Sequence, residues 1–317
     1  MESTLQAEKT LLVEIFNSID FEKITDHPNI LIAAHFWDEE RYEAAKVCYK
    51  FMRAIDDLVD NYKTEHTTLS RTEQDALEAD VCTWIKTILN PEENNTATYG
   101  LTNTIRKFHI PAWPLEDFSR SMISDIYNDG FLTLQAFLDY AKGASVAPAS
   151  IFVHLCGLKR DNDQYFEPAF DVRRISTPCA IFSYLVHIIR NFVKDHTHNL
   201  NYFPDDLMQK YNLNRENLLA MANGAAITTG FRQMISELYA TADEYRQKTF
   251  EIMQEVKPQL EYRSQLSLEI IFALYLMVFE RIDIHKGTFS TAELNPTSQE
   301  IKERVREVIE AFEIKNN

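Results

Sequence analysis

The scarcity of glycine constrains the fold of this chain more than any other feature of its sequence. The 317 residues include 7 glycines, roughly 2%, whereas soluble proteins average about 7%. Sheet proteins and nucleotide-binding α/β folds need glycine at turns and in phosphate-binding loops. The sequence also contains no glycine-rich fingerprint of the P-loop or dinucleotide-binding kind. Long helices joined by few connections are therefore expected.

The net charge of −16 at pH 7 limits the partners that the protein can attract. A surface of this sign repels nucleic acid and anionic membranes, so no nucleic-acid partner is expected. An anionic substrate would need arginines or divalent cations close to it to offset this field.

The cysteines and the first residues predict a cytoplasmic protein. Cys48, Cys82, Cys156 and Cys179 are scattered in apolar, helix-like contexts, which indicates reduced core residues rather than a disulfide frame or a zinc site. The first residues have neither the basic nor the apolar region of a signal peptide. The longest apolar run, residues 270–279, is too short to span a bilayer and predicts a buried helix.

Helical periodicity continues along almost the whole chain. Helices are expected over about 4–19, 39–62, 72–89, a short stretch before residue 111, 115–142, 145–157, 176–196, three long helices within 214–282, and 298–314, with loops over 159–173 and 199–206. No biased linker or short repeat divides the chain. The sequence therefore predicts an all-α, single-domain bundle over residues 1–317, with about ten helices around one core.

The expected helix over 39–62 carries the most informative segment. Asp56 and Asp60 are four residues apart and share a helix face with Arg53 and Tyr49. Like charges at this spacing destabilise an isolated helix, and a bound cation is a reason to tolerate them. The alternative is a solvated acidic face, but apolar residues surround these carboxylates. The pattern predicts a magnesium site, with Arg53 beside it to bind a phosphate.

Three spaced blocks resemble the squalene/phytoene synthase family over roughly residues 25–285. The first runs from Asn29 to Asp60 and places an arginine before DDxxD. The last, RNFVKD at 190–195 followed by NYFP at 201–204, is similar to the family's RDxxED motif and the YLP after it. Between them, DYAKGA at 139–144 resembles the segment whose tyrosine faces the reaction centre.

The resemblance implies packed helices around a deep apolar channel, the isoprenoid synthase fold. It implies Mg²⁺ ions that bridge two acidic helices to the diphosphate of a prenyl substrate, whose ionisation gives an allylic carbocation. By position, the implied metal ligands are Asp56, Asp60, Asn191, Asp195 and His187; the diphosphate-binding residues are Arg53, Arg190 and Asn29; and the catalytic tyrosines are Tyr140, Tyr49 and Tyr202.

The second acidic helix departs from the family pattern. Tyr184, His187, Asn191 and Asp195 stand where the family usually has glutamine, asparagine, aspartate and aspartate. Asn191 can still offer a carbonyl oxygen to a metal, but it lacks the charge. One charge pair at ~4 Å is worth about 4 kcal/mol at an effective dielectric constant of ~20, so the loss weakens metal binding unless it is compensated.

The histidines around Asp195 leave a transition-metal site as an alternative. His196 and His198 follow Asp195 directly, and His187 lies on the same helix. The other interpretation is a polar segment at a helix C-terminus, where histidine is favoured by the helix dipole.

The leading functional prediction is a Mg²⁺-dependent prenyltransferase that joins two prenyl diphosphates head to head. The expected substrate is farnesyl diphosphate, and the expected product is presqualene diphosphate, squalene or a phytoene-type compound. One alternative is a single-substrate terpene synthase or prenyl transfer to a non-prenyl acceptor. Another is a catalytically degenerate isoprenoid-binding or assembly protein.

The cofactor and location predictions follow from this function. Reduction to squalene would need NADPH, on which the sequence gives no information. The protein is expected in the cytoplasm. Peripheral contact with a membrane, into which an apolar product could be released, is the alternative. The sequence does not give the oligomeric state.

Overall fold

Helices make up most of the chain in the computed structural model, which describes residues 2–23, 28–65, 69–89, 99–162 and 164–315. The predicted all-α fold class is confirmed, and the sheet is limited to one two-stranded hairpin in the described ranges. The helices and their short π and 3₁₀ segments (η) are α1 (Glu2–Ser18), α2 (Pro28–Ala34), α3 (Glu39–Glu65), α4 (Arg71–Leu89), α5 (Tyr99–Lys107), α6 (Trp113–Tyr127), α7 (Leu134–Ala141), η1 (Lys142–Val146), α8 (Ala147–Gly157), α9 (Val172–Arg190), α10 (Phe192–Thr197), α11 (Asp205–Lys210), α12 (Arg215–Ala222), α13 (Thr229–Val256), η2 (Lys257–Gln259), α14 (Tyr262–Phe279), α15 (Thr291–Leu294) and α16 (Ser298–Lys315). The strands are β1 (Lys159–Asp161) and β2 (Gln164–Phe166).

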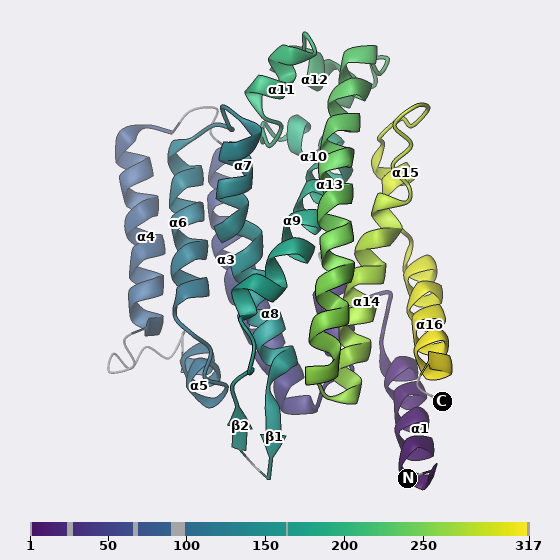
Figure 1. Ribbon diagram of the computed structural model, residues 1–317. Helices are drawn as coiled ribbons and strands as arrows, with labels where there is room; N and C mark the ends of the chain where they lie inside the picture. Colours follow the sequence, from purple (N-terminus) through teal and green to yellow (C-terminus); the bar gives the residue numbers. More distant parts are fainter. Residues whose placement is uncertain (1, 24–27, 66–68, 90–98, 163, 316–317) are drawn as a thin grey trace.

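The long helices run roughly along one direction and enclose the middle of the molecule (Figure 1). Helix α9 packs on α13 and α8, α3 packs on α8 and α6, and α14 packs on α2 and α16. Helices α4 and α5 flank one side, whereas α1 and α16 flank the other (Figure 1). The short helices α10, α11 and α12 gather at one end, and the hairpin lies at the opposite end (Figure 1).

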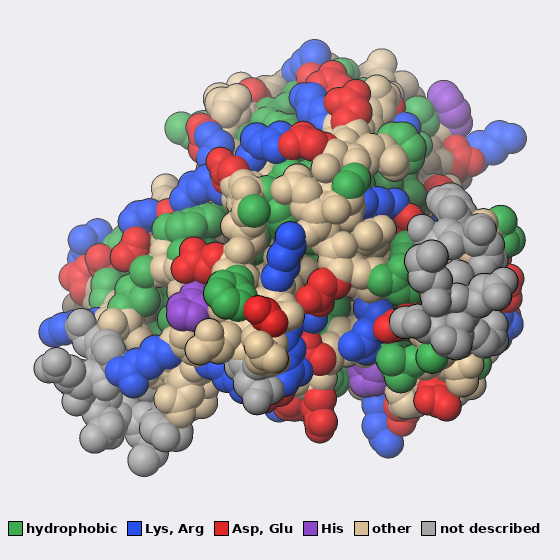
Figure 2. Space-filling model, turned by 60° about the horizontal axis from the view of Figure 1, so that its bottom comes forward, with side chains coloured by type: hydrophobic (Ala, Val, Ile, Leu, Met, Phe, Trp, Pro, Cys, Tyr) green, Lys and Arg blue, Asp and Glu red, His purple; other side chains and the backbone are tan. Residues whose placement is uncertain are grey.

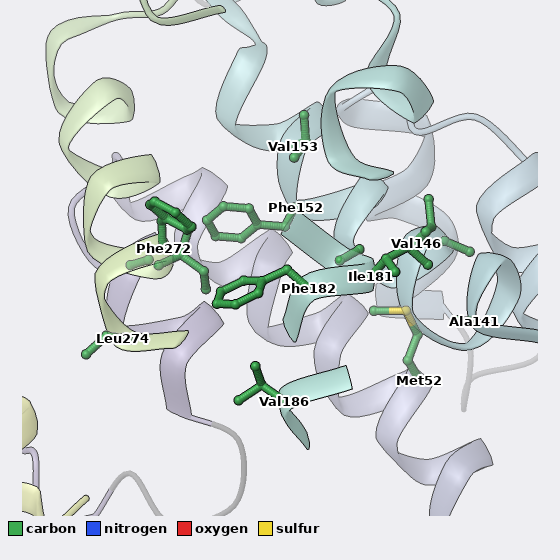
Figure 3. Close-up of a cluster of buried hydrophobic side chains, with 14 of the residues drawn as sticks. Met52, Ala141, Val146, Phe152, Val153, Ile181, Phe182, Val186, Phe272 and Leu274 are labelled. Carbon is green, nitrogen blue, oxygen red and sulfur yellow. The ribbon is translucent and has the colours of Figure 1, made fainter. Parts of the chain in front are cut away.

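One hydrophobic cluster runs through the described chain, from Leu12 of α1 to Phe312 of α16. Figure 3 shows part of it, including Phe182 and Phe272, whose ring centroids are 5.9 Å apart. Cys48 and Cys156 belong to this cluster as expected, but Cys82 is exposed on α4. The prediction of one domain over 1–317 extends beyond the described residues and stays a prediction.

Helix α14 contains the long apolar run of the sequence. Among the described helices it alone has the length and hydropathy that a membrane span requires, but 61% of that window is buried inside the fold. Its apolar residues therefore serve the core, as the sequence predicts for 270–279.

The predicted helix over 115–142 is wrong, because a turn over 128–133 divides it. Asn128 is extended, and Gly130 has a φ of +117°, which residues with a side chain rarely adopt. Thr133 then caps α7 by accepting a hydrogen bond from the backbone N–H of Ala136 at 3.1 Å. The break expected between 142 and 145 is also wrong, because the π-helical turn η1 joins α7 to α8 without interruption.

Two further boundaries differ from the sequence prediction. The segment expected as a loop over 159–173 contains the β1–β2 hairpin, in which Lys159 pairs with Phe166. The helix expected over 176–196 starts earlier, at Val172, and is interrupted at Asn191 between α9 and α10. Periodicity does not reveal where a helix is interrupted by one or a few residues. Single predicted helices are therefore divided in the structure, and the number of helices exceeds the ten expected.

Charged side chains at the hairpin end pair with one another. The buried Arg41 donates to Asp38, to Glu261 and, at 3.1 Å, to the carbonyl oxygen of Leu158. Tyr165 of β2 donates to Asp38 at 3.0 Å. On the face in Figure 2, which brings this end forward, acidic and basic side chains are interspersed. These contacts fasten the hairpin and the start of α14 to the start of α3.

Candidate active site

All eleven residues predicted for the site line one cavity of about 320 Å³. They are Asn29 of α2; Tyr49, Arg53, Asp56 and Asp60 of α3; Tyr140 of α7; His187 and Arg190 of α9; Asn191 at the α9–α10 turn; Asp195 of α10; and Tyr202 in the loop before α11. The volume falls within the range of ligand pockets. The structure therefore brings the three sequence blocks together, whereas the role of each residue stays a prediction.

The rest of the cavity wall is mostly apolar. Among the lining residues are Met52, Phe118, Phe152, Val186, Ile271 and Phe272. Figure 3 shows four of them, Met52, Phe152, Val186 and Phe272, as members of the buried hydrophobic cluster. A ligand with a long apolar chain could bury that chain here and leave its charged group near the carboxylates.

Arg53 is held by the acidic residues of its own helix. Its guanidinium donates to Asp56 at 2.9 Å and to Asp57 at 2.5 Å. These pairs have the (i, i+3) and (i, i+4) spacing that places side chains together on a helix. The Asp56 side chain keeps 34% of its exposure, so solvent can reach this end of the cavity.

The carboxyl groups of α3 and α10 lie close enough to oppose one another's ionisation. Burial, together with the charges of Asp56, Asp125 and Asp195, raises the pKa of Asp60 to about 8. Burial likewise raises the pKa of Asp56 to about 6 and that of Asp195 to about 7. The region around these carboxyl groups is therefore short of positive charge at neutral pH.

These carboxylates fit the requirements of Mg²⁺ bound together with a phosphate ligand. Mg²⁺ usually keeps several waters and uses one or two carboxylates plus substrate phosphates. In the described ranges, no three His, Cys, Asp or Glu side chains come close enough to hold an ion by themselves. The donor set of Asp56, Asp60 and Asp195 thus suits an ion that a phosphate completes.

The alternative of a transition-metal site finds no support in the histidine positions. His196 is buried, and its Nδ1 lies 3.0 Å from the carbonyl oxygen of Phe192. Its ring packs against Phe203 at 5.3 Å between centroids. The Nδ1 of His198 lies 2.7 Å from the carbonyl oxygen of Lys194. Each of these contacts uses Nδ1, and His196 Nε2 is buried without a hydrogen-bond partner in the described chain. No three His, Cys, Asp or Glu side chains gather in the described ranges to hold an ion there.

The wall formed by α9 presents neutral and cationic groups. Arg190 Nη2 lies 2.9 Å from His187 Nδ1, and Arg190 Nε donates to Asn191 Oδ1 at 3.1 Å. Asn191 Nδ2 lies 2.9 Å from His187 Nε2. These residues have the (i, i+3) and (i, i+4) spacing that places side chains together on one helix face, at the end of α9.

Aromatic rings surround the cavity near the carboxylates. Phe131 stacks on Tyr202 with 6.4 Å between ring centroids and packs against Tyr140 at 4.9 Å. Tyr140 in turn lies 6.3 Å from Tyr184. These rings come from the 128–133 turn, α7, α9 and the 199–206 loop, so the fold, not the local sequence, assembles them.

Two lining tyrosines have no role in the sequence prediction. Tyr184 is recognised only as part of the altered helix face, and Tyr275 of α14 lies outside the residues that the sequence singles out for the site. Both line the cavity, and Tyr275 lies close enough to Arg190 to interact with it electrostatically. Tyr275 falls outside the three blocks, so its position became evident only from the packing of α14 against α9.

A buried ion pair fixes α6 beside the acidic helix. Lys63 of α3 donates to Asp125 at 2.9 Å, and both side chains are largely buried. Lys63 also donates to the carbonyl oxygen of Asn128 at 3.3 Å, just before the turn that carries Phe131. Removal of either partner would leave an unpaired buried charge, so the pair supports the position of α3.

The metal-free protein is expected to lose stability as pH rises from about 6 to about 8. At pH 6 the folded state still holds a proton on nearly all Asp60 groups, most Asp195 groups and about half of the Asp56 groups, whereas the unfolded chain, with pKa values near 3.8, has released them. Stability falls with pH wherever the folded state binds more protons. Allowing for solvent screening of partly exposed groups, we expect a loss of about 1–2 kcal/mol.

Thermal or urea unfolding in EDTA across this pH range checks the expectation. Mg²⁺ added with inorganic diphosphate should flatten the profile, because bound cations favour the ionised carboxylates. Burial lowers the pKa of His35, His154 and His196, so these groups add stability as pH rises to about 7 and partly offset the loss. The wild-type profile is therefore compared with that of Asp60→Asn, and identical profiles would contradict the crowding of the carboxyl groups.

Comparisons with known proteins bear on the family and on the fold of this chain. The family model described as squalene/phytoene synthase matches residues 27–312. The structure of a dehydrosqualene synthase in complex with a ligand aligns with a TM-score of 0.67 at 14% identity, covering 99% of this chain and 99% of that chain. Squalene synthase HpnC from Alicyclobacillus acidocaldarius aligns with a TM-score of 0.58 at 15% identity, covering 87% and 94%. YisP from Bacillus subtilis subsp. subtilis strain 168 aligns with a TM-score of 0.61 at 13% identity, covering 96% and 98%.

At these identities, the solved structures show that the fold is shared. The match to the family model, which covers most of the chain, shows the family to which the chain belongs. A comparison with curated protein sequences found no match.

Proposed function

Because the chain belongs to the squalene/phytoene synthase family, we propose that it is a magnesium-dependent prenyltransferase that joins two prenyl diphosphates head to head. The observation that carries the proposal is the position of Asp56, Asp60 and Asp195 at one end of an apolar cavity, with Arg53 and Arg190 beside them. Carboxylates and guanidinium groups suit a metal-bound diphosphate, whereas the apolar wall suits its prenyl chain.

The reaction starts with cleavage of the C1–O bond of one prenyl diphosphate, and the electron pair leaves with the diphosphate. A double bond of the second prenyl chain attacks the allylic cation, and a proton is lost as the new carbon–carbon bonds close. Without a reductant, two farnesyl diphosphates give presqualene diphosphate, diphosphate and a proton. When bound, Mg²⁺ would stabilise the negative charge on the leaving diphosphate.

The side chains of the protein have separate tasks in this scheme. Asp56, Asp60 and Asp195 hold the cations, and Arg53 can turn from Asp56 and Asp57 to a phosphate oxygen. Tyr140 lies in the cavity among aromatic rings whose faces attract a carbocation and exclude water.

A single-substrate reaction is the second candidate. The observation that favours it is that His187 and Asn191, which line the cavity at the end of α9, carry no carboxylate. Asp195 is then the carboxylate that α9 and α10 contribute to the cavity. In that case, one prenyl diphosphate ionises, and the cation cyclises or alkylates a non-prenyl acceptor.

The test is the release of diphosphate from geranyl, farnesyl and geranylgeranyl diphosphate with Mg²⁺ or with EDTA. We expect diphosphate release in the presence of Mg²⁺ and none in EDTA. Mass spectrometry should show that the product from farnesyl diphosphate has twice the carbon number of one prenyl chain. Addition of NADPH shows whether a reduction follows. A product of unchanged carbon number would favour the second candidate, and no release from any of the three would contradict both.

A further inference from the structure

Lys194 of α10 reverses a charge in the second acidic block of the sequence. The block reads RNFVKD over 190–195, whereas the family motif that it resembles reads RDxxED. Asn191 therefore replaces one carboxylate with a neutral amide, and Lys194 replaces another with a positive charge. Asp195 is the one acidic residue left in this block, so the difference from the motif is larger than the change at Asn191 alone suggests.

The charge of Lys194 reaches both helices that carry the carboxylates. Lys194 lines the cavity together with Asp195, its neighbour on α10, and Asp56 of α3. Burial raises the pKa of both carboxyl groups, and the positive charge of Lys194 is among those that oppose this rise at each of them. Arg190 acts in the same direction on Asp195. Lys194 therefore lies near both acidic helices, at the end of the cavity that solvent can reach.

The exposure of Lys194 suits contact with a ligand rather than a role in the core. Its side chain is exposed, so the ammonium group at the end of a flexible stem can move toward a bound anion. The region around Asp56, Asp60 and Asp195 is short of positive charge, and Lys194 reduces this deficit. An acidic residue at 194 would deepen the deficit, and further divalent cations would then have to offset it.

An ammonium group and a magnesium ion are mutually exclusive solutions to the same excess of negative charge. A protonated lysine has no lone pair with which to ligate a metal, and its charge repels a divalent ion beside it. It does offset the charge of a carboxylate or a phosphate, as a compact point charge. The loss of a carboxylate at Asn191 weakens metal binding on this side of the cavity, and Lys194 supplies positive charge there without a metal.

We propose that Lys194 replaces the charge of one Mg²⁺ ion on the α10 side of the cavity, so that the protein takes up fewer Mg²⁺ ions with a diphosphate than it would with an acidic residue at 194. The inference rests on the proposed function, because diphosphate is the charged part of the substrate proposed there. Metal binding then depends mainly on Asp56 and Asp60 of α3, with Asp195 as their acidic partner on α10.

The test counts the Mg²⁺ ions that are taken up when inorganic diphosphate binds. Calorimetric titration of the full chain at a series of fixed free Mg²⁺ concentrations gives the affinity. The slope of log affinity against log free Mg²⁺ gives the number of ions taken up, by mass action. We expect Lys194→Glu to steepen this slope by about one ion and to lower the affinity at low Mg²⁺ about tenfold, because a cation is lost and a carboxylate is added. The difference should shrink as Mg²⁺ approaches saturation.

Two further variants separate the charge of Lys194 from general effects. Lys194→Arg keeps the positive charge and should keep both the slope and the affinity of the wild type. Lys159→Glu makes the same change of charge as Lys194→Glu on β1, at the opposite end of the molecule, and should alter neither quantity (Figure 1). Both positions are exposed, so each variant is expected to fold, and thermal unfolding in EDTA verifies this.

Three results would overturn the inference: the same slope for Lys194→Glu as for the wild type, an equal effect of Lys159→Glu, or no diphosphate binding by the wild type at any Mg²⁺ concentration. Should Lys194→Glu not fold, Lys194→Gln is compared with Lys194→Arg at low Mg²⁺, and equal affinities would contradict the inference. Turnover of prenyl diphosphates is measured separately. A wild type that shows the expected slopes but forms no product contradicts the proposed function and leaves this inference intact.

Discussion

Replacement of Asp60 by asparagine is expected to lower Mg²⁺-dependent diphosphate release at least about 100-fold, the usual cost of losing one group that stabilises charge in a transition state. The same change should stabilise the metal-free protein. Asp60 has the highest pKa of the three carboxyls, about 8, because burial and the charges of Asp56, Asp125 and Asp195 oppose its ionisation. An amide of the same shape removes this repulsion, so we expect a gain of about 1–2 kcal/mol at pH 8.

Opposite signs for activity and stability distinguish a functional carboxylate from a structural one. Steady-state release from farnesyl diphosphate gives the activity, and thermal unfolding in EDTA at pH 8 gives the stability. Asp80→Asn, on the exposed surface of α4, is the matched control and should change neither quantity. If Asp60→Asn keeps more than a tenth of the activity, the site is misassigned. If it loses stability as well, Asp60 serves the fold rather than the reaction.

The sequence predicts the acidic helix well because its information is local. Asp56 and Asp60 are separated by one helical turn, so any helix over 39–62 places them on one face beside Arg53. The other blocks needed a resemblance to known proteins, because periodicity alone does not show that α3 and α10 approach each other. The structure confirms the fold class and brings both blocks to one cavity, but it does not test the roles of the residues.

The features that sequence analysis missed depend on contacts between distant segments. The interruption at Asn191 is a single residue between α9 and α10, which helical periodicity does not reveal. Tyr275 enters the cavity only because α14 packs against α9. The turn at Gly130 contains Asn-Asp-Gly, a sequence typical of turns. The apolar residues on both sides of it nevertheless favoured a continuous helix.

Gly143 in the π-helical turn η1 is the clearest case, because the atoms that leave no room for a side chain there belong to another helix. Gly143 sits where α6 passes closest to η1: a Cβ at this position would lie 2.4 Å from the carbonyl oxygen of Asp117 and 2.1 Å from Ser121 Oγ. Ser121 Oγ also donates to the carbonyl oxygen of Tyr140 at 3.1 Å. Glycine is therefore required here by the approach of two backbones, not by a turn, and the contact holds Tyr140 in the cavity wall.

Replacement of Gly143 by alanine is accordingly expected to destabilise the protein by about 3 kcal/mol, at the upper end of the cost of overpacking a core. The sign is informative, because alanine in place of glycine stabilises an ordinary helix by up to about 1 kcal/mol. The Asp117 oxygen belongs to the backbone of α6 and cannot rotate away, so α6 and η1 must separate. Diphosphate release should also fall, because this shift moves Tyr140.

Gly100→Ala provides the matched control for Gly143→Ala. Gly100 lies in α5, and no atom would come within 4 Å of a Cβ there. The same substitution should therefore leave stability unchanged or slightly increased, with normal activity. Urea unfolding measures both variants. If the Gly143→Ala protein is as stable as the wild type, α6 and η1 can separate at no cost in free energy. The close packing of these two helices would then not explain the position of Tyr140 beside the acidic residues.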